Sequence, residues 1–408
     1  VCADGLGISV EQVRVTAAGR LEIVGTIASS GTVALQAAQG LTNRGTVYAQ
    51  HDAAISVAGE LDNRGGLIAA GGTLAIGDGA AAAAAAGTVA GTAAGTAAGE
   101  RSLQIANAGG TLIADTLSID AAGLSGAGKV LGTTDVDLRL TQDLEHTGEL
   151  AANRHLRLST AGTLTNRSTI TAGQSLSVQA AQIENTSEGT VAAPTLVLQA
   201  RQATGAQGAA NPGLVNRGLI DGGDVLLKGA TIENLAGGRL YGDQLKLDAE
   251  AVRNDGGADG SPHAAPVIAA RTRLDIGADH IVNREGALLY SDGDIAIGRR
   301  LDAVGQASGQ ARLLENRSAS IDAQRDLSIA ADAIRNTNEH HSTRQETRPT
   351  ERIVELAGAG SPNRYRPDTP GVTIYNHESD HLRTPDGDYE RWLRYDYQRS
   401  VTDDVTAR

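Results

Sequence analysis

Apolar and polar residues alternate along most of the chain, in short runs that recur at a fixed spacing. Residues 166–185 and 316–336 show the pattern most clearly. From Ile170 and Ile321 onward, the two segments agree position for position. Alternation with a period of two is typical of a β-strand with one buried face, whereas a helix repeats every three to four residues. The pattern therefore predicts repeated short strands.

Each repeat closes with an apolar residue, one variable residue and an asparagine. Where nothing is inserted, these asparagines lie 18 to 20 residues apart. A period near 20, with two or three short strands and a turn, predicts coils that stack into a right-handed parallel β-helix, an all-β fold. The asparagines are Asn43, Asn63, Asn107, Asn166, Asn185, Asn216, Asn234, Asn254, Asn283, Asn316 and Asn336.

The asparagine column has a structural explanation. A carboxamide carries both a donor and an acceptor, so amides stacked one strand spacing apart can bond along the stack. Asparagine also tolerates the left-handed turn expected at each corner. Gly126 and His146 take its place in two repeats. The next residue is often arginine, as in Asn43-Arg44 and Asn63-Arg64, and we expect that column to face solvent.

Breaks in the period divide the chain. Residues 1–336 are expected to form a body of about 13 coils. Insertions near 79–99, 200–213, 255–266 and 299–312 are expected to be loops at the corners, because corners face water and tolerate extra length.

The alternating pattern stops after Asn336. Residues 337–408 are predicted to form an antiparallel β-hairpin excursion, with strands over 343–356 and 389–405 joined by a loop at 357–388. Aromatic side chains concentrate there, and they either cap the hydrophobic end of the coils or present a binding face. The aromatic residues of interest are Tyr375, Tyr389, Trp392, Tyr395 and Tyr397.

Composition narrows the classes of function. The net charge of −13 disfavours partners such as nucleic acid or an anionic membrane, which need a basic surface. No apolar run reaches the roughly 20 residues of a membrane span. The single cysteine, Cys2, excludes an internal disulfide framework. Only 2% of the residues are aromatic, which suits a thin repeated core. The absence of methionine indicates a piece excised from a longer protein.

Three alternative chemistries are open. Carboxylates on neighbouring coils could act as acid and base in a β-helical polysaccharide lyase or hydrolase, against which the lack of aromatic sugar platforms argues. Residues 291–294 suggest a weak calcium site, although the tandem calcium motif is missing. Histidines at 340, 341, 377 and 381 suggest zinc, but only in a helix that neighbouring Pro and Gly disfavour. The residues weighed for catalysis are Asp221, Asp224, Asp243, Asp292, Asp294, Lys228, Arg239 and Lys246.

The apolar-x-Asn corners, often followed by Arg, and the Ala-x-x-x-Leu-x-Ile-x-Ala pattern resemble the repeats of the filamentous haemagglutinin family over about 20–336. These are the large exoproteins of bacterial two-partner secretion, and they include contact-dependent growth-inhibition effectors. The segment 389–404, YERWLRYDYQRSVTDD, is similar to the Tyr-rich strand that interrupts the repeats in many of them.

The resemblance implies a secreted filament at the cell surface that serves adhesion and virulence. Its implied partners are an outer-membrane two-partner secretion transporter during export and a receptor or glycan on a target cell. A stalk needs no cofactor, metal or catalytic residue, so we expect a non-enzymatic protein. In a narrower form of the stalk hypothesis, residues 337–408 are a receptor-binding module. The exposed Arg column could also contact sulfated glycans, although the negative charge opposes this.

Overall fold

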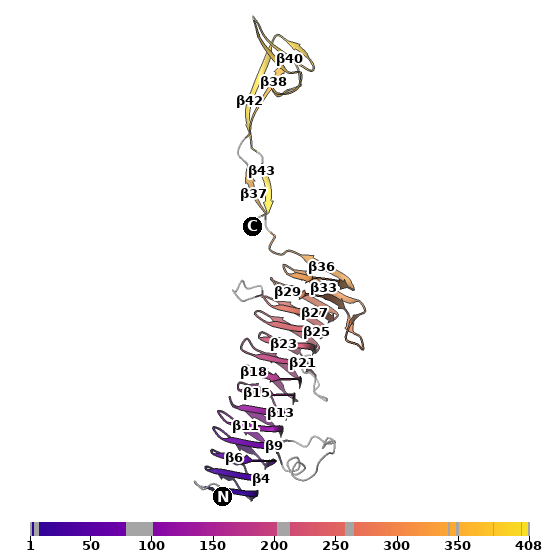
Figure 1. Ribbon diagram of the computed structural model, residues 1–408. Coiled ribbons are helices and arrows are strands. Elements are labelled where there is room, and N and C mark those ends of the chain that lie inside the picture. The colour runs from indigo at the N-terminus through magenta and orange to yellow at the C-terminus, as the bar shows by residue number, and fades with distance from the viewer. Residues whose placement is uncertain are drawn as a thin grey trace. The chain divides into compact units, whose positions relative to one another are not determined.

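The computed structural model describes residues 2–3, 8–78, 101–201, 213–257, 265–341, 343–347, 351–377, 379–400 and 402–406. Two compact units divide the chain, residues 1–338 and 339–408 (Figure 1). Every regular element in the described ranges is a β-strand, which confirms the all-β prediction. The predicted loop at 79–99 lies outside the described residues, as do 202–212 and 258–264 of the two loops that follow it.

Short strands form one face of the first unit, and we call it the short-strand face. It consists of a six-stranded and a nine-stranded sheet, and all pairs within them are parallel. The six-stranded sheet contains β1 (Cys2–Ala3), β3 (Leu21–Ile23), β5 (Leu41–Asn43), β8 (Glu60–Asp62), β10 (Gln104–Ala106) and β12 (Gly123–Ser125). The nine-stranded sheet contains β14 (Leu144–His146), β17 (Thr163–Asn166), β20 (Gln182–Asn185), β22 (Gly213–Asn216), β24 (Thr231–Leu235), β26 (Ala251–Asp255), β28 (His280–Arg284), β33 (Ala311–Arg317) and β36 (Ala331–Thr337).

A larger parallel sheet supplies the rest of each repeat, and we call it the long-strand sheet. Many of its strands shift register partway along, as β11 does between Ala114 and Thr116. Its strands are β2 (Ile8–Ala17), β4 (Thr26–Ala37), β6 (Thr46–Ala49), β7 (Ala53–Val57), β9 (Leu67–Gly77), β11 (Thr111–Ala121), β13 (Lys129–Leu140), β15 (Glu149–Ala152), β16 (His155–Thr160), β18 (Thr169–Ala172), β19 (Ser175–Ala180), β21 (Thr190–Ala200), β23 (Leu219–Lys228), β25 (Arg239–Asp248), β27 (Val267–Gly277), β29 (Leu288–Ser291), β30 (Asp294–Gly298), β34 (Ser320–Ala323) and β35 (Leu327–Ile329).

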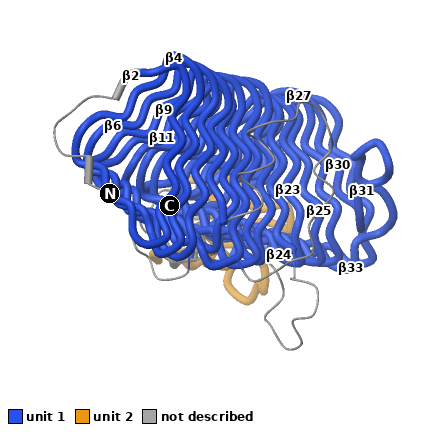
Figure 2. Tube along the Cα trace, turned by 90° about the horizontal axis from the view of Figure 1, so that it is seen from below, with its two compact units in different colours: residues 1–338 blue, residues 339–408 orange. Residues whose placement is uncertain are grey.

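Successive repeats pair residue for residue, so equivalent side chains fall into columns. Leu156 is opposite Leu176, and Leu176 is opposite Leu196. All three side chains are almost fully buried. The tube in Figure 2 shows the repeats of the first unit overlying one another.

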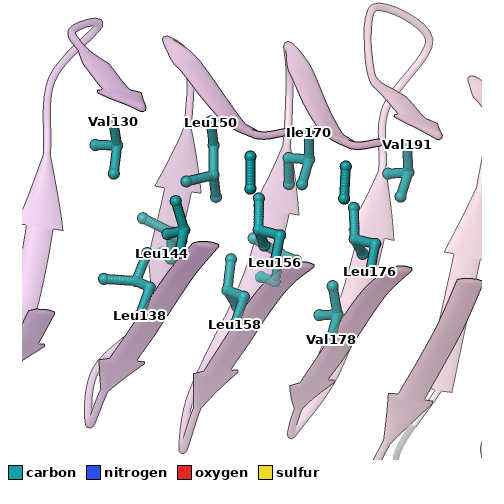
Figure 3. Close-up of a cluster of buried hydrophobic side chains, with 14 of the residues drawn as sticks. Val130, Leu138, Leu144, Leu150, Leu156, Leu158, Ile170, Leu176, Val178 and Val191 are labelled. Atoms are coloured by element: carbon teal, nitrogen blue, oxygen red, sulfur yellow. The ribbon is translucent and has the colours of Figure 1, made fainter. Parts of the chain in front are cut away.

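The core is a set of aliphatic columns between the two kinds of sheet. Figure 3 shows one stretch, where Leu150, Ile170 and Val191 follow one another from repeat to repeat and point inward. Full burial of one such side chain contributes about 1.5–3 kcal/mol. The space inside is narrow, which explains why Val, Leu, Ile and Ala fill it without large rings.

The insertion at 299–312 was predicted to be a loop, and the structure places a small antiparallel hairpin there. Its strands are β31 (Arg300–Leu301) and β32 (Ala307–Ser308). The Asp302 carboxylate closes the turn by accepting hydrogen bonds from the backbone N–H groups of Val304 and Gln306.

The second unit consists of antiparallel strands. β37 (Thr343–Thr347) pairs with β43 (Thr402–Thr406), and β38 (Glu351–Gly358) pairs with β42 (Trp392–Arg399). The predicted loop at 357–388 was wrong in part, because it contains most of a three-stranded sheet. That sheet is formed by β39 (Thr373–His377), β40 (Ser379–Thr384) and β41 (Gly387–Tyr389). Within this sheet, the side chain of Leu382 is fully buried.

Replacing a core side chain should destabilise the stack far more than replacing its outward neighbour. We expect Leu176→Ala to lower the free energy of unfolding by about 2–5 kcal/mol, through lost burial and a cavity. The control Gln179→Ala, on an exposed position of the same strand, should stay within about 0.5 kcal/mol of the parent chain. Urea unfolding followed by circular dichroism measures both. Equal losses in the two variants would contradict the assigned core.

Candidate functional site

Buried asparagine amides run along the short-strand face in two ladders. In every step, Nδ2 of one asparagine donates to Oδ1 of the next, at 2.8 or 2.9 Å. The first ladder joins Asn43, Asn63 and Asn107, and the second runs from Asn166 to Asn336 through Asn185, Asn216, Asn234, Asn254, Asn283 and Asn316. These ladders hold the repeats together at the corner.

Most of these amides also donate to backbone carbonyls, and five of them do so both at their own corner and in the next repeat, namely Asn63, Asn185, Asn216, Asn234 and Asn283. Asn234 donates to Gly238 O at 3.2 Å and to Val267 O at 3.1 Å, and its side chain is fully buried. Amide groups removed from water need such partners, because each unpaired one costs about 1–3 kcal/mol. The asparagines are therefore structural residues whose polar atoms are occupied.

The expected left-handed backbone at the asparagines was wrong. Among the described residues, the only positive φ angles outside glycine are those of Glu285 and Ser318. The chain turns two residues after the asparagine, for example at Gly65 and Gly109, with φ of 69° and 64°. Asparagine is required by the hydrogen bonds of its side chain and not by its backbone conformation.

The two ladders are separated at Gly126 and His146. Asn107 Nδ2 donates to Lys129 O at 3.1 Å and has no amide above it, because Gly126 has no side chain. His146 Nε2 lies 3.0 Å from Thr169 O and makes the carbonyl contact that an asparagine makes elsewhere. His146 therefore substitutes for asparagine in part, as expected, and Gly126 does not.

The arginine column faces solvent in most repeats, as expected, and is also paired with carboxylates. All six arginines that follow a ladder asparagine form an ion pair with a neighbouring Asp or Glu. The pairs are Arg44–Asp62, Arg64–Asp62, Arg167–Glu145, Arg217–Glu184, Arg284–Asp255 and Arg317–Glu315. A sulfated glycan at this column would have to compete with these carboxylates for the guanidinium groups.

Asp62 shows the electrostatics of this column best. Its side chain is 4% exposed, and Arg44 and Arg64 each approach it to 2.7 Å from adjacent repeats. Hydrogen bonds from Arg64 and then Arg44 hold the pKa of this carboxyl far below its usual range. Glu315, between Arg317 and Arg335, has its pKa lowered by the same kind of contact. These carboxylates link coils as charged groups.

The carboxylates considered for catalysis lie at the surface, where each pairs with a cationic side chain or a hydroxyl group of the protein. Asp221 and Asp243 flank Arg271 in an open groove of about 490 Å³, beside Ala193 and Pro194. The other pairs are Asp224 with Lys246, Lys228 with Asp248, Asp294 with Arg325 and Arg273, and Asp292 with the Tyr290 hydroxyl, while Arg239 donates to backbone carbonyls. An arginine between two carboxylates occupies the place where a substrate or cation would sit.

Neither proposed metal site is assembled in the described chain. No group of three or more His, Cys, Asp or Glu residues there is arranged to hold a metal ion. The carboxylate of Asp292 accepts a hydrogen bond from Tyr290, and Asp294 pairs with arginine. The side chains of Cys2 and His377 lie outside the described residues.

The aromatic residues of the second unit lie on several strands, and most of them have polar partners. Arg364 lies 3.8 Å over the Tyr395 ring, and Arg383 lies 5.8 Å from that of Tyr375. Tyr397 donates to Glu355 at 3.0 Å. The Tyr389 ring packs on Gly358 and leaves no room for a Cβ there. Trp392 is opposite the same glycine on the paired strand and is half-buried.

Exposed apolar area in this unit is found elsewhere among the described side chains. Leu393 is 55% exposed, Tyr375 46%, and Ile374 and Tyr397 40% each. Sequence reasoning did not select Leu393 and Ile374 as contact residues, and their strands show no regular alternation of buried and exposed side chains. Together these residues are the candidate contact surface of 339–408.

Removing one amide from the middle of the second ladder should weaken the stack more than removing its last amide. We expect Asn234→Ala to lower the free energy of unfolding by about 2–4 kcal/mol, because it leaves the Asn254 acceptor and one Asn216 donor bond unsatisfied in the core. Asn336→Ala is the matched control, since Asn336 is exposed and accepts one ladder bond. Equal losses in urea unfolding would contradict the ladder's contribution.

The Asp62 carboxylate gives a pH dependence with a defined sign. Its pKa is lowered in the folded chain, so its contribution is fully present above the ordinary aspartate value of about 3.9 and is lost as the pH falls below it. Asp62→Asn should therefore lower the melting temperature at neutral pH, and the deficit should shrink under acid conditions. Asp243→Asn, at an exposed carboxylate, is the control and should change little. A deficit independent of pH would contradict this assignment.

No protein-family model, no curated protein and no solved structure matches this chain. Across the described ranges, no helix has the length and apolarity to cross a membrane. Function must be argued from the arrangement of the repeats, the ladders and the charged corners.

Proposed function

We propose that residues 1–336 form a right-handed parallel β-helix that serves as the stalk of a large secreted bacterial surface exoprotein of the filamentous haemagglutinin type. The stalk extends from the cell to mediate attachment or to carry a distal effector to a target cell. The supporting observation is that the interacting groups of the repeats find their partners within the stack itself. Their amides bond to each other, their aliphatic columns face inward, and their corner arginines pair with their own carboxylates.

A stalk needs stiffness and length and no reacting groups. In-register parallel strands at about 4.8 Å per repeat supply the length. Buried amides and shared carboxylates supply cross-links between neighbouring repeats. Export unfolded through an outer-membrane two-partner secretion transporter suits such a chain, because each repeat can pack on the preceding one as it emerges.

A second candidate assigns contact with the target to 339–408. This unit is compact on its own, and it carries the exposed side chains of Leu393, Tyr375 and Tyr397. Tyrosines and large aliphatic residues on a surface are the groups that commonly carry binding energy in interfaces. In this version, the coils hold a receptor-binding module away from the cell, and its receptor or glycan is a surface component of the target.

Deleting whole coils should shorten the protein without unfolding it. Removing 217–254 joins Asn216 to Asp255 in register, and we expect a decrease in length of about 10 Å in small-angle scattering, at one strand spacing per coil. Attachment of cells that display the full exoprotein should persist, as should attachment with the double variant Asp221→Asn/Asp243→Asn. A folded deletion that no longer attaches would contradict the stalk. Cleavage of a polysaccharide that the double variant abolishes would favour the enzyme.

A further inference from the structure

The short-strand face is interrupted once, between β12 and β14, and we call this place the seam. The six-stranded sheet ends at β12 and the nine-stranded sheet begins at β14, so no strand pairing joins them. The asparagine ladder is broken at the same level, between Asn107 and Asn166. Two independent hydrogen-bond systems therefore stop at one joint, within the described repeats.

The long-strand sheet and the core continue across the seam. On the short-strand side, the backbone N–H groups of Thr141 and Gln142 donate to Ala122 O just before β14 begins. β13 pairs with β11 on one side and with β15 and β16 on the other. On the surface, Gln104 and Gln142 bond to each other at 2.8 Å across the position of Gly123. The seam thus has the geometry of a hinge, since one face is continuous and the opposite face is not.

A small cavity lies inside the seam. It is lined by Asn107, Gly126, His146 and aliphatic side chains, and its volume of about 10 Å³ admits one water molecule. Gly126 cannot simply be replaced by the missing asparagine. Its φ is 93°, and a Cβ there would lie 2.6 Å from the backbone nitrogen of Ala108. The gap in the ladder is therefore enforced by the backbone.

His146 is the titratable group in this gap. Its residue is 7% exposed, and Nε2 uses its proton to donate to Thr169 O. The charged residues facing it are Glu145 on its own strand and Glu149 on β15. Arg167 pairs with the first at 2.8 Å and Lys129 with the second at 3.0 Å. Both carboxylates that line the cavity are thus already paired with a cation, and neither is dedicated to a charged imidazole.

We propose that the seam is an acid-sensitive hinge, which opens along the short-strand face when His146 takes up a proton. The neutral ring lies beside the small cavity with Nε2 donating to Thr169 O, whereas an imidazolium must reach solvent to be hydrated. Burial lowers the pKa of His146 from its ordinary value of about 6.5, against the opposing effect of the Thr169 carbonyl. The seam is therefore most stable above pH 6.5, and that stability is lost as the pH falls through the lowered value.

Hydrogen exchange of the full chain at about pH 7.5 and about pH 5.5 tests the hinge. After correction for intrinsic rates, protection in β12 and β14 should fall about threefold or more relative to β24 and β26, because proton uptake favours the open seam. His146→Asn should remove this difference. His155→Asn is the matched control, since His155 is an exposed histidine in the same region, and it should retain the difference.

Two results would overturn the proposal. One is an equal loss of protection in β12, β14, β24 and β26 of the parent chain. The other is persistence of the seam-specific loss in folded His146→Asn. If that variant does not fold, titration of the His146 ring by NMR in the unaltered chain decides. An apparent pKa at or above 6.5 would contradict a hinge held closed by the neutral ring, and one below it would support the hinge.

Discussion

The first unit depends on one requirement, that a buried carboxamide must find its hydrogen-bond partners in the next repeat. Asn63 and Asn107 are 44 residues apart in sequence, yet their amides meet at 2.8 Å, as they do where no insertion intervenes. Insertions are therefore tolerated only where they leave and rejoin the stack at a corner. The in-register aliphatic columns impose the same spacing, because a shift of one residue would turn each buried leucine outward. Polar and apolar requirements thus select a single register.

The repeat could be predicted from sequence because its period encodes the pairing partner directly. Alternation at Leu176 and Val178 gives the inward face, and Asn185 gives the corner. The carboxylate partners carry only a partial periodic signal. An acid stands just before the corner residue in several repeats, namely Glu22, Asp62, Glu145, Glu184, Glu233 and Glu315. Because Thr42, Ala106 and Val215 occupy the same position elsewhere, the period alone does not predict which carboxylates pair with arginine. The three-stranded sheet in 373–389 escaped prediction because its strands are short, and its fully buried Leu382 stands in a segment rich in Pro, Gly and Asp.

The charges explain how an acidic chain can keep buried carboxylates in a thin body. Asp62, Asp255 and Glu315 each have two arginine neighbours, so the corner column is locally balanced or positive while the whole chain carries −13. Removing two charges from water is favourable only when the geometry is good and the remaining polar atoms are bonded. Sharing one carboxylate between arginines of adjacent repeats meets that condition and fixes their relative height. The arginines that the sequence suggested as contacts for an anionic partner form ion pairs within the stack.

A linear stack is only as cooperative as its weakest nearest-neighbour contact, because each repeat packs against the two beside it. At the seam, the ladder and the short-strand pairing are both missing, and the repeats are joined mainly by the long-strand sheet and by the aliphatic columns around Leu138, Leu144 and Leu150. Apolar contacts are non-directional, so they resist separation while tolerating small rotations that a hydrogen-bonded ladder would forbid. In a stalk, such a joint confines bending or opening to one defined level. The repeats on either side keep their ladders, and the change stays local.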